Sequence, residues 1–92
     1  MIKYKNKAGY TVYSVTSEEC FSWGGFSICD DCGTLCPSGG YLVPVLNHFM
    51  CPSCFQEWND SCKFYPEDSD FEFSICHYYE GILHCVPSNR VL

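Results

Sequence analysis

Two Cys-x-x-Cys pairs constrain this chain more than any other feature. The first pair is Cys29 and Cys32, and the second, eighteen residues further on, is Cys51 and Cys54. Two intervening residues allow a tight turn that brings both sulfur atoms onto one metal ion, at about 2.3 Å for zinc. Two such pairs at this separation are typical of a zinc site. We therefore expect Cys29, Cys32, Cys51 and Cys54 to bind one structural zinc ion, with no position open for a catalytic water.

The other cysteines leave alternatives open. The chain has nine cysteines in 92 residues. Disulfides are typical of secreted proteins, whereas the first residues, MIKYKNKAGY, lack the apolar segment of a signal peptide, so we expect a cytoplasmic protein with reduced thiols. Iron is the alternative ion, because four thiolates also bind iron. Cys36 lies near enough to compete as a ligand. A second metal site would need a histidine or the remaining cysteines, which we expect to be buried thiols instead: Cys20, Cys62, Cys76 and Cys85.

The size of the chain favours a metal-stabilised fold. At this length one domain is expected, and a chain this short buries only about 60–65% of its unfolded surface. Hydrophobic residues make up 47% of the sequence, which excludes a disordered tail. No apolar run approaches the ~18 residues of a membrane span. We expect one zinc-stabilised α+β domain over residues 1–92.

The first half of the chain predicts strands and one short helix. Residues 10–15 alternate as a strand after a turn at residues 6–9. Thr16 and Glu19 form a capping box, which predicts a helix over residues 17–23. Residues 41–46 indicate a strand that Pro44 interrupts, so we expect an edge position. A turn at Asn47 and His48 would lead into Phe49 and Met50 and complete a hairpin.

The second half predicts two helices. Pro52 is favoured at a first helical position, and Pro66 predicts an end near Tyr65. A second helix is expected from about Asp70 to Cys85, after a capping box of Ser69 and Glu72. A strand through Phe71, Phe73 and Ile75 is the alternative. The first helix places its apolar residues and cysteines on one face: Cys51, Cys54, Phe55, Trp58, Cys62 and Tyr65.

The order of these features resembles the treble-clef family of zinc modules over about residues 26–66. In that family a turn supplies two ligands, a hairpin follows, and the start of a helix supplies the other two ligands. The resemblance implies that Cys29 and Cys32 lie in the turn and that Cys51 and Cys54 lie at the start of the helix.

The charge of the chain is strongly localised. The formal net charge is −6, and residues 57–80 contain seven acidic residues against Lys63 alone. This argues against a DNA-binding zinc finger, which needs cationic side chains to displace phosphate counterions. Five carboxylates are expected to form an acidic patch that binds a basic protein, flanked by Phe64 and Phe71: Glu57, Asp60, Glu67, Asp68 and Asp70.

The sequence predicts no catalytic site. His77, Glu80 and His84 are expected on a solvated helix face. His48 resembles in position a residue of zinc-framed nucleases, but the further histidine and acidic partner of such a site are not evident. The acidic run from Glu67 to Glu72 lacks the ligand spacing and central glycine of a calcium loop.

The whole chain resembles small proteins of phages and mobile elements of Gram-positive bacteria in its size, acidity and cysteine usage. Among such proteins are inhibitors of CRISPR nucleases. The resemblance implies a non-enzymatic, phage-encoded inhibitor (an anti-CRISPR) that binds an RNA-guided nuclease or another nucleic-acid-binding enzyme in the host cytoplasm, and neither nucleic acid nor a membrane directly. The alternative is a zinc-framed nucleic-acid-binding or transcription-regulatory domain. It would need a cationic face from the few basic residues present: Lys3, Lys5, Lys7, Lys63 and Arg90.

Overall fold

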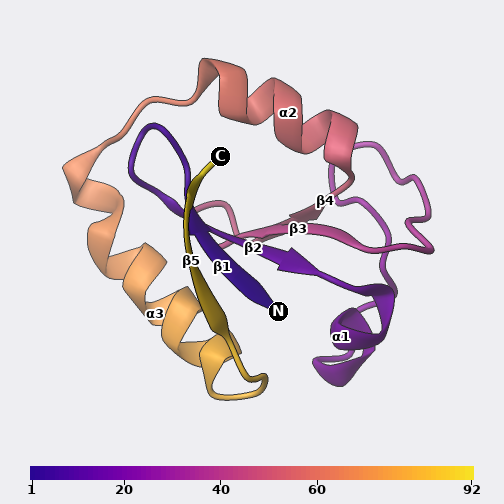
Figure 1. Ribbon diagram of the computed structural model, residues 1–92. Coiled ribbons are helices and arrows are strands. Elements are labelled where there is room, and N and C mark those ends of the chain that lie inside the picture. The colour runs from indigo at the N-terminus through magenta and orange to yellow at the C-terminus, as the bar shows by residue number, and fades with distance from the viewer.

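The computed structural model describes residues 1–92 and has the α+β architecture that the sequence predicts. One five-stranded sheet has the strand order β4-β3-β2-β1-β5 (Figure 1). Every pair of neighbours is antiparallel except β1 and β5. The elements are β1 (Ile2–Lys5), β2 (Thr11–Val15), α1 (Ser17–Ser22), β3 (Gly40–Val43), β4 (His48–Met50), α2 (Pro52–Ser61), the 3-10 turn η1 (Pro66–Asp68), α3 (Ser69–Glu80) and β5 (Val86–Val91).

The N-terminal hairpin and α1 form where the local sequence predicts them. Asn6 closes the β1–β2 turn, because its side-chain oxygen accepts hydrogen bonds from the backbone N–H groups of Gly9 (3.0 Å) and Tyr10 (2.8 Å). The Thr16 and Glu19 capping box is present in full, since each side chain accepts from the other residue's backbone N–H. Both motifs satisfy backbone donors locally, so the sequence alone specifies them.

The β3–β4 hairpin is shorter than expected. Val45 and Leu46 lie in the turn rather than in a strand. Asn47 turns the chain with a φ of 53°, a left-handed conformation that asparagine tolerates. The expected edge position is also wrong: β3 is internal and β4 is the edge strand. Pro44 is compatible with this placement because it follows the strand and owes no hydrogen bond to the ladder.

Helix α2 begins at Pro52 as predicted but ends at Ser61, before Tyr65. Cys62 is extended (φ −67°, ψ 135°). The following residues reach across to the N-terminal hairpin, where the Asn6 amide contacts Cys62 Sγ at 3.6 Å. The Tyr65 N–H donates to the Tyr10 hydroxyl at 2.8 Å. Tertiary contacts therefore end the helix one turn earlier than its apolar pattern indicates.

The predicted helix is confirmed as α3 and the alternative strand is wrong, but the helix ends at Glu80 rather than near Cys85. The expected capping box of Ser69 and Glu72 is wrong, because Ser69 already has helical dihedrals and Asp68 occupies the N-cap without a side-chain bond. Glu72 instead accepts a hydrogen bond from the backbone N–H of Thr11 at 2.8 Å. The helix start is thus set by the preceding η1 turn and by the sheet.

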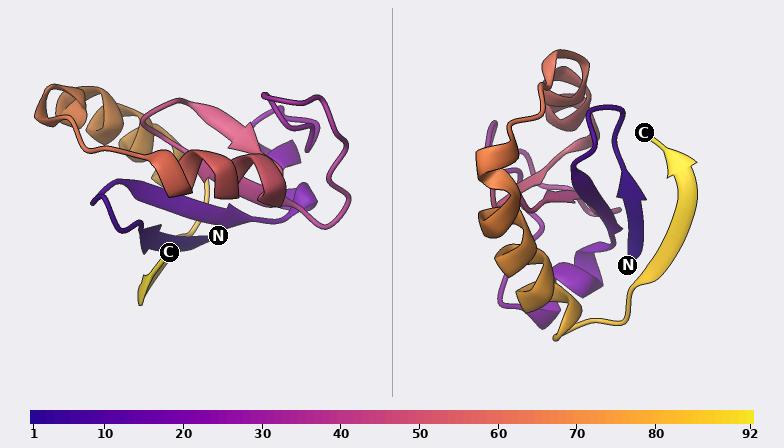
Figure 2. Two further views of the ribbon diagram at one scale, coloured as in Figure 1. Left: turned by 90° about the horizontal axis from the view of Figure 1, so that it is seen from above. Right: turned by 90° about the vertical axis from the view of Figure 1, so that its left-hand side faces the viewer.

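Strand β5 was not predicted. It runs parallel to β1, and the backbone of Val86 donates to the Met1 carbonyl at 2.9 Å. Most of its side chains are exposed, so the segment lacks the apolar alternation that marks a half-buried strand. Figure 2 shows it as the outermost strand beside β1.

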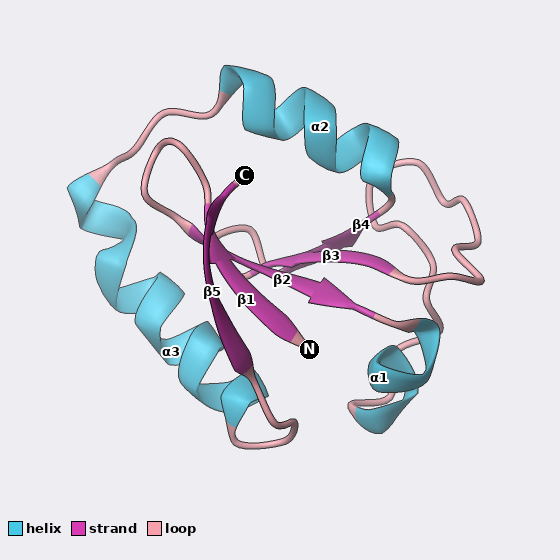
Figure 3. Cartoon of the chain, in the orientation of Figure 1, coloured by secondary structure: helices cyan, strands magenta, loops and turns pink.

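Helices cover both faces of the sheet (Figures 1 and 3). On one face the ring of Tyr41 in β3 stacks on Phe55 of α2, with ring centroids 4.2 Å apart. On the other face the hydroxyl of Tyr13 in β2 donates to Glu80 of α3. Val12, Tyr13, Leu42 and Val43 in the central strands are each at most 1% exposed. Two covered faces allow this short chain to bury a core on either side of one sheet.

Candidate metal centre

The structure brings the four predicted cysteines into one cluster. The Sγ atoms of Cys29, Cys32, Cys51 and Cys54 all lie within 4.8 Å of one another. Sγ of Cys32 lies 3.8 Å from Sγ of Cys51. A tetrahedral ion with zinc–sulfur bonds of about 2.3 Å requires sulfur atoms roughly 3.8 Å apart, whereas a disulfide requires about 2.05 Å. The donor set and its spacing therefore fit one structural zinc ion.

The first pair lies in a tight turn of the loop between α1 and β3. The backbone N–H of Cys29 donates to the Thr34 carbonyl, and that of Gly33 donates to the Cys29 carbonyl, both at 2.9 Å. Gly33 has a φ of 75°, which favours glycine after the second ligand. An isolated bridge between Ile28 and Leu35 closes the base of the turn. These local bonds define the turn that places the two sulfur atoms.

The second pair lies at the start of α2. Cys51 is the N-cap, and its Sγ accepts a hydrogen bond from the backbone N–H of Cys54 at 3.4 Å. Amide groups and the positive end of a helix dipole favour thiolates there. Asp30 fastens the first turn to β4, because its carboxylate accepts from the Phe49 N–H (2.8 Å) and its own N–H donates to the Phe49 carbonyl (2.8 Å). The order of turn, hairpin and helix agrees with the treble-clef resemblance.

Hydrogen bonds within the cluster shift the pKa values of its thiols. The Thr34 hydroxyl, whose oxygen lies 3.1 Å from Cys32 Sγ, and the Thr34 N–H lower the pKa of Cys32 to about 6. The pKa of Cys54 is raised well above its usual value, mainly by its hydrogen bond with Cys51. The two thiols share one site, and their pKa values are shifted in opposite directions. A divalent metal would displace the thiol protons and balance the gathered negative charge.

The remaining five cysteines do not join the four-sulfur cluster. None of the nine cysteines forms a disulfide. Cys36 is buried beside the turn, with its Sγ 3.5 Å from the Thr34 carbonyl, but it is not among the four clustered ligands. Burial raises the pKa of Cys20 to about 11, as expected for a packed thiol rather than a ligand. No three of Cys20, Cys62, Cys76, Cys85 and the histidines share a site.

The histidines and Glu80 have other partners. His48 opens β4, and its Nδ1 lies 3.1 Å from the Asp31 carboxylate. His77 stacks against Phe73 on the surface of α3, at 6.1 Å between ring centroids. His84 lies beyond the end of α3, not on the helix face where it was expected. Glu80 accepts hydrogen bonds from Lys3 (2.9 Å) and from Tyr13.

The predicted acidic residues lie on the outside of the molecule. Glu57 and Asp60 are exposed on α2, and Glu67 and Asp70 are exposed at η1 and the start of α3. Asp68 is half-buried, because its carboxylate accepts a hydrogen bond from Tyr10 at 2.9 Å. We call these five residues the acidic surface. The aromatic side chains of Phe64 and Phe71 are about half exposed beside it.

Two features of this region were not predicted from the sequence. Thr34 and Asp30 support the metal centre, and their positions beside Cys29 and Cys32 are a usable signal. A pocket lined by Tyr10, Trp58 and Tyr65 has no local signal, because its walls come from separate elements.

No helix is long and apolar enough to cross a bilayer.

The chain matches no family model, no curated protein and no solved structure. The assignment of a metal centre therefore rests on the geometry and chemistry of the four cysteines.

Proposed function

We propose that the protein is a non-enzymatic, zinc-stabilised module that binds another protein through its acidic surface. The observation that carries the proposal is the unpaired state of these carboxylates. The ion pairs of the chain engage Glu19, Glu80 and Asp31, and none involves the acidic surface. Unpaired surface carboxylates maintain a negative potential that attracts a cationic partner.

The class of partner follows from the charge. A groove that holds a nucleic-acid backbone is cationic, and a negative surface that fits it is attracted over long range. The resemblance to small phage proteins narrows this class to an RNA-guided nuclease of the host, which the protein would inhibit by occupying its nucleic-acid channel.

Direct nucleic-acid binding has less support. Of the five basic residues, Lys3 is paired with Glu80, and the Lys5 ammonium donates to the Thr11 hydroxyl at 3.1 Å. Lys7, Lys63 and Arg90 remain, and Lys63 lies among the carboxylates of residues 57–80. This is too little cationic surface to release many phosphate counterions.

The test compares matched charge reversals. Asp70 and Glu18 each occupy the exposed first turn of a helix, so Asp70→Lys and Glu18→Lys change the same charge in similar surroundings. We expect wild-type protein to bind an RNA-guided nuclease at low salt and to compete with its target DNA. The single variant D70K should associate more slowly than the wild type, and the double variant E67K/D70K about tenfold more slowly, whereas E18K should behave as the wild type.

Equal effects of D70K and E18K would contradict the acidic-surface mechanism. Absence of binding to any of a panel of such nucleases would contradict the proposed partner class. The comparison of variants and the nuclease binding assay are valid only when the zinc content and circular dichroism of each variant equal those of the wild type.

A further inference from the structure

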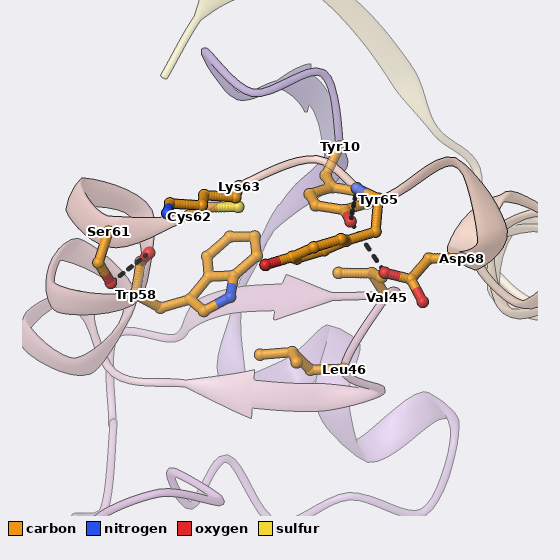
Figure 4. Close-up of a pocket in the computed structure, with 9 residues that line it drawn as sticks. All are labelled: Tyr10, Val45, Leu46, Trp58, Ser61, Cys62, Lys63, Tyr65 and Asp68. Carbon is orange, nitrogen blue, oxygen red and sulfur yellow. Dashed lines mark hydrogen bonds between the residues drawn. The ribbon is translucent and has the colours of Figure 1, made fainter.

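A pocket of about 530 Å³ opens beside the acidic surface, between the C-terminal end of α2, the β3–β4 turn and the segment before η1. Figure 4 shows the side chains of Trp58 and Tyr65 converging from opposite sides over Val45 and Leu46. Its volume lies in the range typical of ligand pockets. The full lining is Tyr10, Val45, Leu46, Trp58, Ser61, Cys62, Lys63, Tyr65 and Asp68.

The walls of this pocket are fixed by hydrogen bonds. The hydroxyl of Tyr10, a residue only 2% exposed, accepts from the Tyr65 N–H (2.8 Å) and donates to Asp68 Oδ2 (2.9 Å). Asn6 holds the backbone of Tyr10 through its side-chain oxygen and contacts Cys62 through its amide. A pocket whose walls are already in place loses less entropy when a ligand enters.

The lining chemistry favours a cation. The faces of Trp58 and Tyr65 carry the negative part of an aromatic quadrupole, which attracts cations. Asp68 uses Oδ2 for Tyr10, and its second carboxylate oxygen is left to accept from a ligand. Residues 60–70 contain four carboxylates against Lys63. Lys63 lies with Ser61 and Cys62 on the side of the pocket away from Asp68 (Figure 4).

We infer that this pocket receives an arginine side chain of the partner protein. A guanidinium is planar, so it stacks on an indole or phenol ring and presents its N–H groups to a carboxylate at the same time, whereas an ammonium does only the latter well. The inference rests on the proposed function, because it names the side chain through which a basic partner would be anchored next to the acidic surface.

The experiment uses the zinc-loaded full chain and two capped pentapeptides, Gly-Gly-Arg-Gly-Gly and its counterpart with neutral citrulline. Amide and indole NMR signals are followed during titration. The Trp23 indole is the internal control, because it packs on Tyr79, with ring centroids 5.0 Å apart, and does not line the pocket. We expect the arginine peptide to shift the Trp58 indole signal and to bind about tenfold more tightly than the citrulline peptide.

Three variants separate the contributions. Asp68→Asn keeps an acceptor for Tyr10 and should weaken arginine binding about three- to tenfold, while Glu18→Gln removes a distant exposed carboxylate and should not. Lys63→Gln should tighten binding, because it removes the cation from the wall. Equal affinity for the two peptides, no shift at Trp58, or equal effects of D68N and E18Q would overturn the inference. The proposed function fails separately, on E67K/D70K, because Glu67 and Asp70 do not line the pocket.

Discussion

At the scale of single residues, the nine cysteines have different roles because they lie in different positions of the fold. Four gather within 4.8 Å, and the others lie in core or half-buried positions on separate elements. The four ligands were predictable because Cys-x-x-Cys specifies a local turn and four thiolates specify a small set of metals. The aromatic pocket was not predictable, because Tyr10, Val45, Trp58 and Asp68 are neighbours only after the sheet and helices have assembled.

Matched serine substitutions on α2 test the ligand assignment. Cys54→Ser removes a clustered sulfur at the start of the helix, whereas Cys62→Ser makes the same chemical change at its C-cap. We expect C54S to lose stoichiometric zinc and to unfold, because a structural zinc site contributes on the order of 10 kcal/mol. C62S should retain one zinc per chain. Elemental analysis and near-UV circular dichroism measure both. A wild-type chain without metal, or a folded C54S with one zinc, would contradict the assignment, and iron in place of zinc would identify the other ion.

At the scale of elements, two similar sequence motifs have different outcomes. Thr16 and Glu19 form a true capping box because Thr16 has an extended ψ of 165°. Ser69 and Glu72 have the same spacing, but η1 already gives Ser69 helical dihedrals, so Glu72 is released to bond the sheet. The existence of α2 and α3 was predictable from their apolar periodicity. Their ends were not, because they depend on contacts with the β1–β2 hairpin. Strand β5 was missed because its pairing with β1 gives it order without burial.

The bond between Glu72 and Thr11 predicts a measurable loss of stability. Thr11 is 3% exposed, so Glu72→Ala would leave a buried N–H without its acceptor. We expect a loss of about 1–3 kcal/mol in the free energy of unfolding. Glu72→Gln retains an acceptor oxygen and should recover most of it. The control is Glu57→Ala on the exposed face of α2, expected within about 0.5 kcal/mol of the wild type. Urea unfolding compares the variants, and equal stabilities of E72A and E57A would show that this bond contributes nothing.

At the scale of the whole molecule, the metal centre and the sheet share one core. Cys29 and Cys51 belong to the same buried cluster as Val12, Tyr13 and Leu42. Strands β3 and β4 of the zinc module belong to the same sheet as β2 and β1, because β3 pairs with β2. The treble-clef resemblance covers only residues 26–66, so it does not predict that the hairpin of the zinc module extends into a five-stranded sheet with the N-terminal and C-terminal segments.

This continuity predicts that zinc removal unfolds the entire chain in one transition. A small domain has a total stability of about 5–15 kcal/mol, and a structural zinc contributes on the order of 10 kcal/mol of it. After addition of a strong chelator, amide hydrogen exchange at Val12 in β2 should therefore rise together with that at Met50 in β4.

Acid should also remove zinc and destabilise the fold. Zinc binds thiolates, and a thiol such as Cys54, whose pKa is raised mainly by its hydrogen bond with Cys51, takes up its proton readily when the pH falls. Zinc affinity, and the stability it provides, should be largest at neutral pH and above and should fall as the pH is lowered. The midpoint of acid unfolding should move to lower pH when zinc is in excess. If, after zinc removal by chelator or acid, β2 stays protected from exchange while β4 exchanges, residues 26–66 form an independent zinc module. The shared core then does not couple the zinc module to the rest of the sheet.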